Sequence, residues 1–127
     1  MDLVWKKLKT LISAAEQDAA GILVITTILP AEAQSLLDEF KRSANPKLEI
    51  RQWTHIKRPS KDELHKLVNG ACCILLTLRE VVDEEFLDAV GPSLKAISVY
   101  GTGYDHIDVD LIRRRGISLG NTPGAVT

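Results

Sequence analysis

The sequence has few cysteines, few aromatic residues and almost no net charge. Its two cysteines, Cys72 and Cys73, are adjacent, which suits neither a disulfide framework nor a zinc site and favours a reducing cytoplasm. Lys and Arg number 16 and Asp and Glu 17, so a net charge of -1 offers no field that attracts nucleic acid or anionic lipid. No apolar run approaches the roughly 20 residues that span a bilayer. We therefore expect no nucleic-acid partner and no membrane association.

The 127 residues, 45% hydrophobic and 26% charged, have the composition and length of one globular domain. Short apolar runs that do not alternate with polar residues are typical of strands buried on both faces. Amphipathic segments of about ten residues separate these runs, which predicts a parallel sheet with helices on both faces. The fold class is therefore α/β. The strands are predicted at 22–27, 48–53, 71–76, 94–100 and 117–119.

Helix starts carry recognisable capping residues. Ser60 and Glu63 have the spacing of a capping box, in which each side chain accepts a hydrogen bond from the other residue's backbone amide. Asp83 and Asp108 precede two further amphipathic segments and are predicted to cap them. His65 falls on the polar face of the helix that Ser60 begins, so it is expected at the surface.

Residues 1–20 differ from the rest of the chain. They contain no continuous apolar stretch and carry acidic residues, which excludes a secretory signal peptide. Apolar residues recur there at helical spacing, so the segment is predicted to form a separate amphipathic helix. An apolar stripe usually packs on a domain, and this interpretation is favoured over a membrane-surface helix.

The loop Gly101-Thr102-Gly103 is the first candidate for chemistry. A dinucleotide fingerprint would need a third glycine where His106 stands, so this loop is not expected to bind a cofactor. Open α/β sheets hold ligands at the carboxyl ends of their strands, and glycines let backbone amides approach an anion. A plain turn remains the alternative. Thr77 ends the third strand at the same edge, where it either faces a ligand cleft or carries a solvated hydroxyl.

Other polar groups have structural interpretations. Asp105, Asp108 and Asp110 do not predict a metal site, because Asp108 is a cap and Asp110 a first-turn acid facing the helix dipole. His106 beside Asp105 is expected to make a structural hydrogen bond. The arginines at 113–115 end a helix, where they complement its dipole. The sequence therefore assigns no metal ligand and no catalytic residue.

Two segments together resemble a known family. Residues 94–108, LKAISVYGTGYDHID, and residues 115–124, RGISLGNTPG, are similar to the signature of D-isomer-specific 2-hydroxyacid dehydrogenases. Within that family the glyoxylate/hydroxypyruvate reductases are most similar. The resemblance covers residues 21–127 and is strongest from Leu94 onward.

This resemblance implies a fold and a function. Residues 21–120 would be the N-terminal part of a substrate-binding domain with a flavodoxin-like sheet, and 121–127 the start of a hinge to a Rossmann NAD(P) domain. The full-length enzyme would reduce 2-oxo acids to D-2-hydroxy acids with NAD or NADP as its cofactor. The amides of Thr102 and Gly103 would hold the substrate carboxylate. Thr77 and Leu78 would line the cleft.

The resemblance also implies what this chain lacks. The catalytic Arg, Glu and His of the family lie beyond the position of Thr127, so the chain alone is expected to be inactive and to bind no cofactor. The full-length parent is expected to be a cytoplasmic homodimer. A self-contained flavodoxin-like module that binds a small molecule or regulates a partner, without enzymatic activity, is the alternative.

Overall fold

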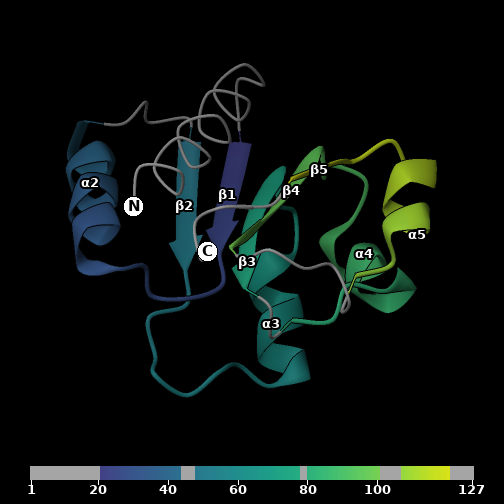
Figure 1. Ribbon diagram of the computed structural model, residues 1–127, viewed down its shortest axis with the longest axis horizontal. Helices are drawn as coiled ribbons and strands as arrows, with labels where there is room; N and C mark the ends of the chain where they lie inside the picture. Colours follow the sequence, from purple (N-terminus) through teal and green to yellow (C-terminus); the bar gives the residue numbers. More distant parts are fainter. Residues whose placement is uncertain (1–20, 44–47, 78–79, 101–106, 121–127) are drawn as a thin grey trace, which may run out of the picture.

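The computed structural model describes residues 21–43, 48–77, 80–100 and 107–120 as a parallel sheet with helices on both faces (Figure 1). The predicted α/β class is confirmed. The predicted helix at 1–20 and hinge at 121–127 lie outside the described residues. The strands are β1 (Gly21–Ile25), β2 (Leu48–Gln52), β3 (Cys73–Thr77), β4 (Ala96–Tyr100) and β5 (Ser118–Gly120). The helices are α2 (Ala31–Ser43), α3 (Lys61–Val68), α4 (Glu84–Val90) and α5 (Val109–Arg114).

The strand order is β2-β1-β3-β4-β5, and every neighbouring pair is parallel. This is the flavodoxin-like order, in which the direction of winding reverses between β1 and β3. In Figure 1, α2 lies on one side of the sheet, and α3, α4 and α5 lie on the other. The sheet is therefore covered from both faces, as the uninterrupted apolar runs predicted.

Successive residues of each central strand point into two different cores. Leu23 and Leu75 face α2, where they join Ala33 and Leu37 in one apolar cluster. The intervening residues face the opposite core, which α3, α4 and α5 complete. Side chains of that second core include Val24, Ile74, Leu76, Ile97, Val99, Val68, Phe86, Leu87 and Ile112. Burial on both faces explains why no polar residue alternates in these strands.

Strand boundaries differ from the prediction by one or two residues. β4 begins at Ala96 because the amides of Lys95 and Ala96 both donate to Cys72 O, at 2.8 and 3.3 Å, before the ladder with β3 starts. β5 begins after Ile117 because the Ile117 amide donates 3.1 Å to Ile112 O and so still belongs to the end of α5. Local hydrophobicity cannot detect such end effects.

The predicted caps are confirmed. Ser60 Oγ accepts from the Glu63 amide at 3.2 Å, and Glu63 Oε1 accepts from the Ser60 amide at 3.0 Å. Asp83 Oδ1 accepts from the Phe86 amide at 2.9 Å, and Asp108 Oδ1 from the Leu111 amide at 3.0 Å. Each interaction satisfies a backbone donor that the first helical turn leaves without a partner.

His65 is less exposed than its place on the polar face of α3 predicts. The imidazole is half-buried and meets the Phe86 ring edge-on, with 6.5 Å between ring centroids. The helical spacing placed His65 correctly beside the polar face, but α4 packs against α3 and covers it.

Replacing Ser60 by alanine is expected to lower the free energy of unfolding by about 1 kcal/mol, the usual contribution of an N-cap. Urea unfolding measures it. The matched control is Ser35→Ala, because Ser35 is exposed inside α2, where alanine is the better helix former. An unchanged stability of the Ser60 variant would mean that packing alone fixes the start of α3.

Ser60→Ala should also change how the free energy of unfolding depends on pH in the acid range. The Ser60 backbone amide and hydroxyl lower the pKa of Glu63 below its ordinary value. A carboxyl whose pKa is lowered by folding stabilises the protein above its unfolded pKa, and this contribution is lost as the pH falls through the folded pKa. Ser60→Ala should therefore lower the free energy of unfolding by more at pH 7 than at about pH 3. An equal cost at both pH values would contradict this coupling.

Candidate functional site

The carboxyl ends of β3 and β4 form the edge at which sequence analysis places a ligand. The two strands are paired so that Thr77 stands opposite Tyr100. After these strands the chain is joined again at an isolated parallel bridge between Val82 and Ile107, where the Asp108 amide donates 3.1 Å to Val82 O. Val82 and Ile107 are both buried. The described chain is therefore paired at Thr77 and Tyr100, where the two strands end, and paired again at Val82 and Ile107.

Three of the four predicted substrate contacts belong to these segments. Leu78, Thr102 and Gly103 lie outside the described residues, and so do Asp105 and His106. Their roles remain predictions. The structure describes the residues on either side of them, namely the paired strand ends Thr77 and Tyr100 and the bridged pair Val82 and Ile107.

Thr77 is the fourth predicted contact, and the structure describes it. The residue is half-buried at the end of β3. Its amide donates 3.0 Å to Glu80 Oε2, and its hydroxyl donates to the same oxygen. The alternative of a solvated loop hydroxyl is therefore wrong. A contact between Thr77 and a substrate stays a prediction.

Glu80 is a residue that sequence analysis missed. Only 6% of it is exposed, although acidic residues are rarely buried without a partner. One carboxylate oxygen accepts both hydrogen bonds from Thr77. The spacing of Thr77 and Glu80 is that of a capping box, and this was the available signal. Here it follows the end of β3 rather than marking a helix start, so the motif did not predict a buried carboxylate.

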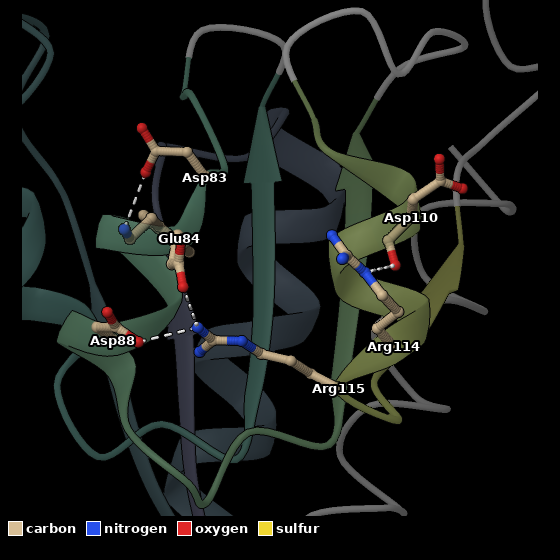
Figure 2. A network of polar contacts seen from close by, with 7 residues as sticks. Asp83, Glu84, Asp88, Asp110, Arg114 and Arg115 are labelled. Atoms are coloured by element: carbon tan, nitrogen blue, oxygen red, sulfur yellow. Dashed lines mark hydrogen bonds and ion pairs between the residues drawn. The ribbon is translucent and has the colours of Figure 1, made fainter.

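Arg115 forms ion pairs that link the end of α5 to α4 (Figure 2). Arg115 Nη2, just beyond α5, lies 2.9 Å from Asp88 Oδ1 and 3.7 Å from Glu84 Oε1, both on α4. Arg114 Nε instead donates 3.4 Å to Asp110 O within its own helix. The interpretation of the arginines as partners of the helix dipole is thus incomplete, because Arg115 links α5 to α4. This link lies at the surface and is expected to contribute little stability.

The described part of the chain also bears on the two cysteines, on metal ligands and on membrane-spanning helices. Cys72 and Cys73 are both buried, which confirms their prediction as core residues. No group of three or more His, Cys, Asp or Glu side chains among the described residues is placed to hold a metal ion. In the same residues no helix is both long and apolar enough to cross a bilayer.

Most of the chain, including the candidate site, is similar to known proteins. The model of the D-isomer specific 2-hydroxyacid dehydrogenase catalytic domain matches residues 22–127. The glyoxylate reductase/hydroxypyruvate reductase of Homo sapiens is 38% identical over 103 residues, which cover 81% of this chain and 30% of that protein. The solved TT0316 protein of Thermus thermophilus aligns with a TM-score of 0.67 at 33% identity, covering 81% of this chain and 30% of that one.

A second solved structure adds a cofactor to the comparison. The NAD+-bound 3-phosphoglycerate dehydrogenase of Entamoeba histolytica aligns with a TM-score of 0.66 at 26% identity, covering 84% of this chain and 34% of that one. The chain therefore spans about 30% of the length of the relatives it matches. With the family model matched over residues 22–127 and the sheet order as expected, the chain belongs to the D-isomer specific 2-hydroxyacid dehydrogenase family.

Proposed function

We propose that the chain is the N-terminal part of the substrate-binding domain of a reductase. The full-length protein would convert 2-oxo acids of the glyoxylate or hydroxypyruvate type into D-2-hydroxy acids. The observation that carries this proposal is the pairing of the carboxyl ends of β3 and β4 at one edge of the sheet, together with the match to the family over residues 22–127. That edge is where parallel sheets bind ligands.

Each candidate residue has a role in this proposal. The amides of Thr102 and Gly103 hold the substrate carboxylate, since backbone N–H groups bind an anion without a competing side chain. Leu78 and Thr77 line the cleft beside it, and Glu80 fixes the amide and hydroxyl of Thr77. NADH or NADPH, bound elsewhere in the full-length protein, supplies the hydride.

The remaining chemistry is proposed to lie outside this chain. An arginine that polarises the keto group and a histidine that supplies the proton are expected beyond Thr127, so the chain alone has no turnover. We further propose that the full-length protein is a homodimer of the cytoplasm, a compartment that suits the two adjacent cysteines, Cys72 and Cys73.

The decisive experiment measures oxidation of NADH and NADPH by the full-length protein with glyoxylate and with hydroxypyruvate. We expect turnover with at least one substrate and one cofactor. The 127-residue chain should show none, and its Kd for either cofactor should be weaker than about 100 μM. A full-length protein that binds small acids but turns over no 2-oxo acid would favour the non-enzymatic, regulatory alternative.

Binding of NADH to the 127-residue chain with a Kd below about 100 μM would contradict the division of roles. In that case the segment after β4 would be tested as a cofactor site. Isothermal titration calorimetry at 25 °C distinguishes these outcomes. A Kd of about 1 μM instead of about 100 μM would correspond to a binding free energy more favourable by about 2.7 kcal/mol.

A further inference from the structure

A cavity of about 360 Å³ opens between the N-terminal ends of α3 and α4. It lies on the face of the sheet opposite α2, and its lining includes Arg58, Leu64, His65, Glu80 and Val81. Its volume is at the lower end of the range for small-molecule sites. Charges of both signs and an apolar wall meet in it.

Glu80 is the buried charge of this cavity. Its Oε2 accepts both hydrogen bonds from Thr77, whereas its Oε1 accepts none from the residues that the structure describes. Among the described residues, Ser98 Oγ is the fully buried side-chain polar atom that has no hydrogen-bond partner. Glu80 Oε1 is not such an atom, so it keeps some contact with solvent. Glu80 lines the cavity and is only 6% exposed, and Oε1 is the carboxylate oxygen that Thr77 leaves available for a ligand. A carboxylate so poorly solvated gains from a ligand that donates a hydrogen bond.

Arg58 is the complementary charge. Two other charged groups of the lining are already engaged, since Lys61 pairs with Glu85 at 2.6 Å and Asp83 caps α4. Arg58 is exposed and forms no ion pair with the described residues. A guanidinium binds a carboxylate or phosphate group through two parallel hydrogen bonds. The cavity thus offers Arg58 for an acid group of a ligand and Glu80 for a hydrogen-bond donor of the same ligand.

Part of the cavity wall is apolar. The lining includes Val81, which is 60% exposed, and Leu64, which is buried. We propose that the cavity binds a small organic acid that also carries a hydroxyl or ammonium group. The acid group binds Arg58, the donor binds Glu80 Oε1, and the carbon chain packs on Val81. This binding needs no cofactor and no turnover, so it is independent of the reductase proposal.

The test is an NMR titration of the ¹⁵N-labelled 127-residue chain with β-alanine and 3-hydroxypropanoate. Propanoate, which lacks the donor, is the control ligand. We expect saturable shifts of the Leu64 and Val81 amides, with affinities for the first two at least about ten-fold above that for propanoate. Absence of saturable shifts for all three acids up to about 20 mM would overturn the proposal.

Two variants and one matched control locate the binding. Arg58→Gln should weaken both ligands about ten-fold or more, whereas Lys57→Gln, the same charge loss one residue outside the lining, should stay within about two-fold. Glu80→Gln keeps an oxygen that can accept from Thr77 but loses the charge, so it should abolish the preference over propanoate. Equal losses at Lys57 and Arg58 would show diffuse charge attraction instead of a site. A preference retained in Glu80→Gln would contradict the role of Oε1.

Discussion

Replacing Gly103 by valine in the full-length protein is expected to raise the KM for a 2-oxo acid ten-fold or more. If the amides of Thr102 and Gly103 hold the substrate carboxylate, a Cβ at Gly103 stands where the anion approaches the backbone. The loss corresponds to about 1.4 kcal/mol or more of binding free energy. Thr102→Val is the matched variant, because it changes a side chain and keeps the amide. It should leave KM within about three-fold.

Cofactor affinity and folding are the controls for this pair. The Kd for NADH or NADPH should be unchanged in both variants, since the segment after β4 lacks the third glycine of a dinucleotide fingerprint. Far-ultraviolet circular dichroism and urea unfolding show whether Gly103→Val is folded. If this variant lost NADH binding but kept its KM for the 2-oxo acid, the segment would be a cofactor site and the assignment wrong.

The architecture explains why so large an effect is expected from one Cβ. The segment that contains Gly103 is anchored at Tyr100 by the β3–β4 ladder and at Ile107 by the bridge to Val82. Asp108 then caps α5, and its amide bonds to Val82 O. With the described residues on both sides held in this way, we expect little room for the chain to move away from a side chain added at Gly103. Geometry held by buried anchors is what binding sites require.

Much of the fold could be predicted from sequence because its determinants are local. Uninterrupted apolar runs such as the one around Ile74 predict doubly buried strands, and cap residues such as Asp83 mark helix starts. The order of the strands is a non-local property, and no periodicity contains it. It was predicted only through the resemblance of the segment around Gly101 to a family whose fold is known, and the structure confirms it.

The candidate site was predicted less completely because its described polar contacts depend on tertiary packing. Glu80 follows a strand and an arginine in sequence, a context typical of an exposed turn, yet it folds back onto Thr77 and is buried. Arg115 ends a helix, which explains its dipole interpretation, but its partners Asp88 and Glu84 belong to another helix. Such contacts join residues whose proximity the local pattern cannot reveal.

Replacing Phe86 by alanine is expected to lower the free energy of unfolding by about 3–5 kcal/mol, the largest stability effect predicted for this chain. Phe86 is the largest of the fully buried side chains, with 1% exposed. It belongs to the apolar cluster that contains Val82 and Ile107, the two residues of the bridge that anchors the site. A domain of this size is stabilised by about 5–15 kcal/mol, so the loss consumes a large part of its stability.

Val81→Ala is the matched control for Phe86→Ala, because Val81 shortly precedes the helix that contains Phe86 but is 60% exposed. Its cost should stay below about 0.5 kcal/mol. Both values come from urea unfolding, and amide hydrogen exchange at Ile107 and Asp108 shows whether the anchor loosens. We expect faster exchange at these amides in Phe86→Ala, since the cavity removes packing beneath the bridge. A loss below about 1 kcal/mol would mean that the cluster collapses around the missing ring, and unchanged exchange would show that the anchor does not depend on Phe86.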